Sequence, residues 1–174
     1  MMRALCVVWI ALMLSACASY QQGNKNSMIR ASYEAADRLA AMAYPTVKVD
    51  QPVIVATFVQ LDQLTETTNF GRLMAEQVAS RLLVQQYPIV ELKLRGSVFV
   101  REGKGELLLS REVKDISAAH NVQAVVVGTY VVAGEKLFLN MKVVRPLDNR
   151  VLAAHDLAID IDATTRALLM SEPS

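Results

Sequence analysis

The sequence predicts an α+β domain on a mixed β-sheet, with a βαβ unit, about three helices and a C-terminal antiparallel meander. Two observations lead to this prediction. A β-branched run, a long amphipathic pattern and a second strand pattern follow one another in the first half of the domain, as expected for a parallel crossover unit. Later, three strand patterns follow one another with only short turns between them, which is typical of antiparallel neighbours.

The first helix is predicted over Met28–Tyr44, where apolar side chains recur every three or four residues. Pro45 ends it, because proline pushes the preceding residue out of the α region. Glu34 and Arg38 are spaced to form an i,i+4 ion pair. Small side chains favour packing on a sheet over a membrane-surface helix, since the polar face mixes both charges. The apolar stripe consists of Ile29, Tyr33, Ala36, Ala40 and Ala43.

The strand–helix–strand unit comes next. Pro52–Val59 is β-branched and predicts a buried strand. The loop Gln60–Asn69 ends in Thr67, Thr68 and Asn69, which are suited to cap a helix. The second helix is predicted over Phe70–Leu83 and ends before Pro88, after which Ile89–Leu94 alternates as a strand. The unit is long enough for a crossover, which would be right-handed.

A short β-like run at Val98–Val100 and a glycine-rich turn at residues 103–105 precede the third helix. Ser110 is a good N-cap for this helix, predicted over Arg111–His120. Asn121 follows it and can adopt the left-handed conformation that ends helices.

The meander is predicted from the strands Gln123–Val132, Leu137–Arg145 and Val151–Ile161. The first is nearly all apolar, which predicts a central strand covered on both faces. A last helical turn is predicted at residues 164–170. The third strand alternates, with Leu157, Ile159 and Ile161 facing inward and Asp156, Asp160 and Asp162 facing outward.

The first residues have the pattern of a bacterial secretion signal. A short positive start precedes the apolar run Ala4–Leu14, which is shorter than the roughly 20 residues that a membrane-spanning helix needs. The next residues resemble the lipobox of bacterial lipoprotein precursors, in which Leu14, Ser15 and Ala16 are recognised by the signal peptidase and Cys17 receives the lipid. An ordinary secretory signal with a chance cysteine is the alternative.

This resemblance divides the chain into a signal peptide (residues 1–16), a lipidated flexible tether (residues 17–27) and a single domain (residues 28–174). The tether is polar and lacks periodicity. By resemblance to enterobacterial sorting signals, Ala18 directly after the lipidated cysteine favours the outer membrane. We therefore expect a lipid-anchored outer-membrane protein that faces the periplasm.

The composition excludes several classes of protein. Removal of residues 1–16 leaves 158 residues with 17 basic and 17 acidic side chains, since Arg3 is the one charge lost. A net charge of zero gives no electrostatic reason to bind nucleic acid or an anionic lipid surface. Membrane attachment must therefore come from the lipid on Cys17. Because Cys6 leaves with the signal peptide, the domain has no thiol for a disulfide, a zinc site or a nucleophile.

No catalytic, cofactor-binding or metal-binding residue is predicted. His120 and His155 lack ligand spacing and cysteine partners. Gly103-Lys104 does not fit a phosphate-binding loop, and no serine stands in a nucleophile elbow. The sequence therefore predicts that the protein is not an enzyme. It indicates no small-molecule substrate. Calcium needs a wrapped loop, whereas three aspartates lie along the last predicted strand: Asp156, Asp160 and Asp162.

A family resemblance is carried by Gly105–Val113, Ala124–Tyr130, Leu137–Val144 and Val151–His155, together with the upstream segments Val53–Phe58, Phe70–Leu83 and Tyr87–Arg95. Through them, residues 30–162 resemble the FlgO family of outer-membrane lipoproteins. The layout is also similar to the amino-terminal domain of TolB and the periplasmic domain of CsgG-type lipoproteins. Relatives commonly carry glycine before the last strand, where this chain has Asp148-Asn149; asparagine tolerates the positive φ of such a turn.

The resemblance implies an envelope protein that supports the flagellum of polar-flagellated bacteria. We therefore expect a non-catalytic structural or interaction role in flagellar assembly, stability or motility. Its partners would be proteins of the cell envelope or the flagellar base. The alternative is a binding module of a TolB-like or secretion complex unrelated to flagella, and a periplasmic enzyme is the third hypothesis.

Overall fold

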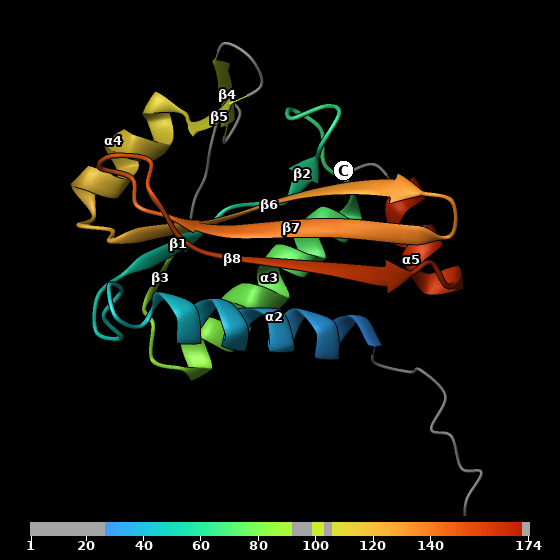
Figure 1. The fold of residues 1–174 in the computed structure, drawn as a ribbon, viewed down its shortest axis with the longest axis horizontal. Helices are drawn as coiled ribbons and strands as arrows, with labels where there is room; N and C mark the ends of the chain where they lie inside the picture. Colours follow the sequence, from blue (N-terminus) through green and yellow to red (C-terminus); the bar gives the residue numbers. More distant parts are fainter. Residues whose placement is uncertain (1–26, 92–98, 103–105, 172–174) are drawn as a thin grey trace, which may run out of the picture.

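The computed structural model describes residues 27–91, 99–102 and 106–171 (Figure 1). No helix in these ranges is long and apolar enough to span a bilayer. The four helices in them are α2 (Ser27–Ala43), α3 (Asn69–Val84), α4 (Arg111–Ala119) and α5 (Ala163–Met170). The strands are β1 (Val53–Val55), β2 (Val59–Gln60), β3 (Ile89–Val90), β4 (Phe99–Glu102), β5 (Glu106–Leu109), β6 (Ala124–Ala133), β7 (Lys136–Val144) and β8 (Val151–Asp160).

The predicted fold class is confirmed. Six strands form one mixed sheet in the order β3-β1-β6-β7-β8, with β2 paired to β6. β1 and β3 are parallel and joined through α3, which makes the βαβ unit. β6, β7 and β8 are antiparallel neighbours joined by short turns, which makes the meander. β4 and β5 form a separate antiparallel pair.

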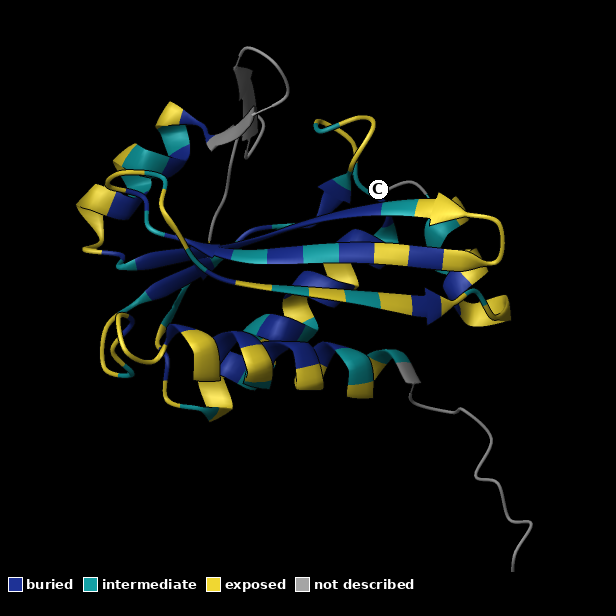
Figure 2. Ribbon diagram, in the orientation of Figure 1, coloured by how far each residue is buried: buried dark blue, intermediate teal, exposed yellow. Residues whose placement is uncertain are grey.

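The two faces of the sheet are covered differently. α2 and α3 lie on one face (Figure 1), over a core that includes Leu39, Met74 and Met141. α4 lies on the other face, over a smaller core around Ile54 and Val113. Between the two cores β6 is buried over most of its length (Figure 2), which confirms the prediction of a central strand.

The prediction of one continuous strand over Pro52–Val59 is wrong. Val55 pairs with Val126 and Val59 with Thr129, so the chain between β1 and β2 holds one residue more than the facing stretch of β6. An extra residue of this kind interrupts the ladder and bends the strand. Here it accompanies Phe58, which is fully buried in the core.

The buried stripe predicted for the first helix is partly wrong. Ile29 and Tyr33 are 40% and 37% exposed, whereas Ala35 and Leu39 are fully buried. α2 contacts both α3 and β8, so the side that faces inward is set by two neighbours rather than by one sheet. The predicted pair of Glu34 and Arg38 is confirmed, with 2.8 Å between its charged atoms.

The helix termini mostly follow the prediction. Ser110 caps α4 by accepting a hydrogen bond from the Val113 amide, and Asn121 after it has a φ of 51°. Thr68 occupies the N-cap position of α3 but forms no side-chain cap; its hydroxyl pairs with the hydroxyl of Tyr130 instead.

The last part of the chain differs in one detail. The helical turn predicted at residues 164–170 is α5, and Asp162 accepts a 2.7 Å hydrogen bond from the Thr165 amide. Asp162 is therefore a helix cap beyond the end of β8, and not an outward strand residue. Of the strand predicted at residues 89–94, Ile89–Val90 forms β3 and Glu91 is not in a strand. Residues 92–94 lie outside the described ranges, as do Val98 and the turn at 103–105.

Candidate functional site

Two glycines and an aromatic cluster fix β6 against α3. Phe58 packs against Gly128, where an added Cβ would lie 2.5 Å from the ring. Gly71, in the first turn of α3, is crowded first by the backbone oxygen of Phe58, and then by the Thr67 hydroxyl at 2.5 Å and the Tyr130 ring at 2.9 Å from an added Cβ. The rings of Phe70 and Tyr130 meet edge to face, with centroids 5.3 Å apart. This packing holds β6 in a fixed position beneath the surface described next.

On the face of the sheet away from α2 and α3, the meander presents rows of side chains. Alternate residues of a strand point to opposite faces, so Lys136, Phe138, Asn140 and Lys142 of β7 share this face. Their partners on β6 and β8 stand beside them in the ladder. We call this surface the open face; its rows across β6, β7 and β8 are Val131–Phe138–Ala158, Thr129–Asn140–Asp156 and Val127–Lys142–Ala154.

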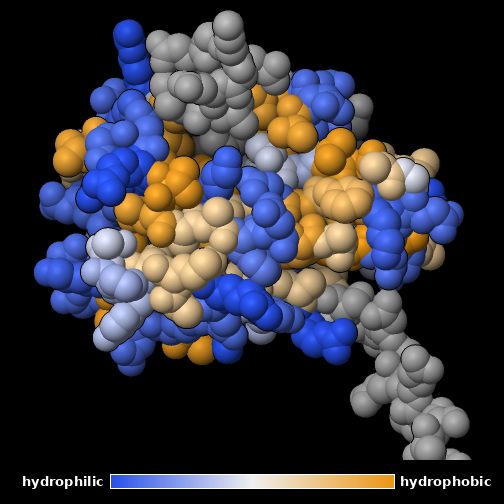
Figure 3. Space-filling model, in the orientation of Figure 1, coloured by the Kyte–Doolittle hydropathy of each residue, from blue (hydrophilic) through white to orange (hydrophobic). Residues whose placement is uncertain are grey.

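α4 and the residues leading into it cover only one end of this surface. Leu109 and Val113 pack there with Val127 and Val144. Further along β7, the Phe138 side chain is 48% exposed. Figure 3 shows apolar and polar patches side by side over the meander, so the surface offers both kinds of contact.

Two polar side chains of β7 on the open face are already paired. Lys136 Nζ lies 2.5 Å from the Asp160 carboxylate, and the Asn140 amide donates a hydrogen bond to the Asp156 carboxylate. Both partners stand directly across the β7–β8 ladder. The cross-strand neighbour of Lys142 is Ala154, and within the described part of the chain Lys142 forms no ion pair.

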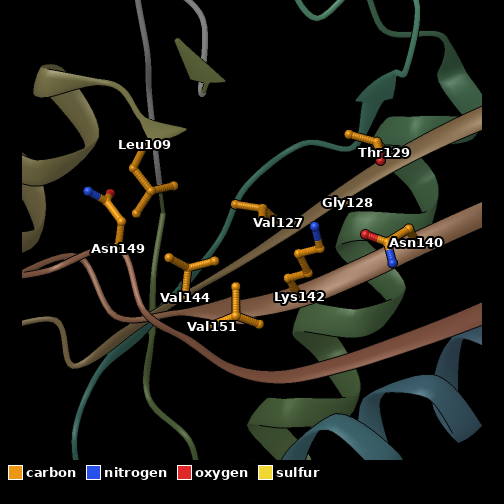
Figure 4. Close-up of a pocket in the computed structure, with 9 residues that line it drawn as sticks. All are labelled: Leu109, Val127, Gly128, Thr129, Asn140, Lys142, Val144, Asn149 and Val151. Atoms are coloured by element: carbon orange, nitrogen blue, oxygen red, sulfur yellow. The ribbon is translucent and has the colours of Figure 1, made fainter. Parts of the chain in front are cut away.

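A small cavity of about 60 Å³ opens beside Lys142. Figure 4 shows the Lys142 side chain extending from β7 toward β6. A volume of this size holds about two water molecules and is far below the roughly 300–1,000 Å³ of cofactor and drug-sized sites. The cavity therefore suits a single functional group. It is lined by Leu109, Val127, Gly128, Thr129, Asn140, Lys142, Val144, Asn149 and Val151.

The β7–β8 turn supplies Asn149 to this cavity. Asn149 has a φ of 57°, the left-handed conformation that asparagine is expected to tolerate in this turn. Beside it Arg145 and Asp148 form a 2.8 Å ion pair, and hydrogen bonding from the guanidinium lowers the pKa of the Asp148 carboxyl. The side-chain oxygen of Asn149 is buried, and no described residue donates a hydrogen bond to it.

The residues that the sequence predicts to be recognised by the signal peptidase and to be lipidated lie outside the described residues: Leu14, Ser15, Ala16 and Cys17. His120 is the C-cap of α4 and His155 is on β8, so the structure does not bring the two histidines together. Among the described residues, no group of three His, Cys, Asp or Glu side chains is placed to hold a metal ion.

Sequence reasoning missed Lys142, Asn149 and Phe138. The alternation of Leu137–Arg145 was visible and places Lys142 and Phe138 on one face. The ion pairing of Lys136, and its absence at Lys142, depend on the exact β7–β8 register, which turns alone do not specify.

The family model for FlgO protein matches residues 33–164, more than half of the chain. No curated protein sequence matches the chain at a significant level. The C-terminal domain of LpoB from Salmonella enterica is similar in structure, with a TM-score of 0.53 and 10% identity over 73% of this chain and 96% of that one. For LpoB from Escherichia coli the TM-score is 0.52, with 10% identity over 75% and 98% of the two chains.

Lipoprotein GNA1162 from Neisseria meningitidis has a TM-score of 0.46 and 12% identity, over 65% of this chain and 82% of that one. At these identities the two LpoB domains show a shared fold alone, and the GNA1162 likeness is too low to carry an argument. The extent of the family match, over nearly all of α2 to β8, is what decides the assignment. The chain belongs to the FlgO protein family.

Proposed function

We propose that this protein is an outer-membrane lipoprotein that faces the periplasm and acts by binding other envelope proteins, in the assembly or stability of the flagellum. The observation that carries the proposal is the sequence Leu14-Ser15-Ala16-Cys17, placed after an apolar run and before a polar tether and a FlgO-family domain. Lipid on Cys17 would hold the domain at the membrane, since two or more acyl chains anchor a protein stably.

A binding role is supported by the open face. Phe138 is exposed there beside polar residues, and aromatic side chains are enriched at protein interfaces. The cavity beside Lys142 has room for one functional group. The non-catalytic role is proposed because the chain belongs to the FlgO family and its sequence predicts no catalytic constellation.

Cys17→Ser tests the membrane attachment, and Cys6→Ser is its matched control, because Cys6 lies inside the predicted signal peptide. We expect the Cys6→Ser chain to be processed and to fractionate with the outer membrane. The Cys17→Ser chain should fold and be released from the membrane on cell fractionation. Detergent-dependent membrane association of the Cys17→Ser chain would contradict the lipid anchor.

Deletion of the gene tests the flagellar part. We expect fewer or less stable flagella and reduced swimming, both restored by the intact gene and not by the Cys17→Ser form. Normal flagella and normal swimming in the deletion strain would reject the flagellar role. If the protein is nevertheless lipid-anchored, its role is that of a binding module in another envelope complex.

A further inference from the structure

We propose that the cavity beside Lys142 receives the carboxylate of an acidic side chain, presented by a segment of a partner protein that also covers Phe138. This inference rests on the proposed function as a protein-binding lipoprotein. It adds the place of contact and the chemistry of the partner.

The charge argument comes from the pairing on β7. Lys136 has Asp160 opposite it, whereas Lys142 has Ala154 and forms no ion pair with the residues that the structure describes. Lys142 is also only partly exposed, and apolar walls such as Val127 and Val144 line the same cavity. An ion pair is stronger where water is partly excluded, so a carboxylate is the group that this cavity favours.

Phe138 sets the size of the partner. It lies four residues from Lys142 on the same face of β7, a separation of about 13 Å at 3.3 Å per residue. The cavity of about 60 Å³ accepts a carboxylate and little more. A ligand that fills the cavity and also covers Phe138 must therefore be a chain segment that runs along the open face.

A second copy of this chain, stacked through the same face, is disfavoured. Among the described residues of the open face the carboxylates are Asp156 and Asp160. Asp156 accepts a hydrogen bond from Asn140, and Asp160 pairs with Lys136. A copy that offers this face has to break one of these contacts before it can reach Lys142, which favours a different protein as the occupant.

The test is crosslinking in living cells with the full chain. Phe138 is replaced with the photoreactive residue p-benzoylphenylalanine, and the adduct formed on illumination is quantified and sequenced by mass spectrometry. Three forms are compared: no further change, Lys142→Gln, and the matched control Lys136→Gln. Lys142→Arg keeps the positive charge, so it shows whether a lower adduct yield comes from loss of the charge or from loss of the ammonium geometry. Melting temperatures show that each form is folded.

We expect one adduct whose yield falls at least about tenfold with Lys142→Gln, since loss of a partly buried charge pair typically costs one or more decades of affinity. The yield should stay within about twofold for Lys136→Gln and Lys142→Arg. The crosslinked partner peptide should contain Asp or Glu near the crosslinked position. Changing that residue to Lys should remove the adduct, and Lys142→Glu should restore it.

Four results would overturn the inference: no adduct, an adduct with a second copy of this chain, a partner peptide without an acidic residue, or a yield that Lys142→Gln leaves unchanged. The proposed function is tested separately by gene deletion. If deletion impairs the flagellum while Lys142→Gln leaves adduct and swimming unchanged, the flagellar role stands and only this inference fails. The opposite result is that deletion leaves flagella normal, while Lys142→Glu combined with Lys in the partner restores the adduct. In that case the flagellar role fails and this inference stands.

Discussion

Gly128→Ala tests whether the close approach of β6 to Phe58 determines how the sheet packs against α3. An added Cβ would lie 2.5, 2.6 and 2.7 Å from three ring carbons of Phe58, whereas carbons in ordinary contact stay about 3.5–4.0 Å apart. The ring must therefore move by about 1 Å. Phe58 is fully buried within the main core, so this movement displaces further side chains.

The expected loss of stability follows from two opposing effects. Overpacking of a core costs about 1–3 kcal/mol. Replacing glycine by alanine in a strand interior recovers about 0.5–1 kcal/mol, because alanine loses less backbone freedom on folding. We expect the free energy of unfolding to fall by about 1–2 kcal/mol, a measurable part of the roughly 5–15 kcal/mol of a typical domain.

The assay is urea unfolding of the purified chain followed by circular dichroism, with Gly128→Ala measured alone and together with Phe58→Ala. Alanine lacks the Cγ and both Cδ carbons that the new Cβ would meet, so the cost of Gly128→Ala should fall by about 1 kcal/mol in its presence. Gly134→Ala is the control. Gly134 lies in the β6–β7 turn with a φ of 61° and no atom within 4 Å of an added Cβ, so its cost is backbone strain and is the same in both backgrounds.

Equal costs of Gly128→Ala with and without Phe58→Ala would refute this reasoning. The destabilisation would then arise from the strand backbone, and the contact between Phe58 and β6 would not determine the packing.

Two further predictions concern the helix termini, and both are measured by the same unfolding assay. Tyr130→Phe should lower stability by about 1–3 kcal/mol, because it removes the hydroxyl that accepts from the buried Thr68 amide at 3.0 Å; a cost near zero would contradict it. Asp162→Ala should cost about 0.5–2 kcal/mol at pH 7 by removing the cap of α5. The hydrogen bonds from Thr165 lower the pKa of Asp162 in the folded protein, so its contribution is full above the unfolded pKa of about 3.9 and is lost as the pH falls through the folded value. The difference between wild type and Asp162→Ala should therefore shrink from pH 7 to about pH 2, and a difference that is constant with pH would show that ionisation plays no part.

Much of the fold could be predicted because local signals agreed with the tertiary structure. Pro45 lies just after α2, as its effect on the preceding residue requires. α3 ends at Val84, before Pro88 as predicted, and Gln86 follows it with a φ of 69°. The apolar run of β6 correctly predicted burial on both faces of that strand. The alternation in β7 correctly predicted that one face of that strand is covered. Each of these patterns depends on neighbours close in sequence.

The predictions were wrong where contacts between residues far apart in the sequence determine the local structure. The break between β1 and β2 accompanies the burial of Phe58 against Gly128, seventy residues away, and no strand pattern reports that contact. The inward side of α2 was misplaced because it packs on α3 and β8 together. Tyr33, expected in the core, instead lies under the Arg81 guanidinium, whose carbon is 5.6 Å from the ring centroid.

The uncovered part of the sheet also has a physical origin. α4 has nine residues and β6 has ten, which correspond to about 14 Å of helix and about 33 Å of strand. One short helix cannot cover the whole face. Polar side chains of β7 lie on the remainder beside the exposed Phe138, and pairing across the ladder satisfies Lys136 and Asn140. Lys142 stands where the covered and uncovered parts meet, beside a cavity and without a carboxylate opposite it. A lysine needed only for solubility would not have to lie at that boundary beside a cavity. For this reason the proposed contact with a partner is placed at Lys142.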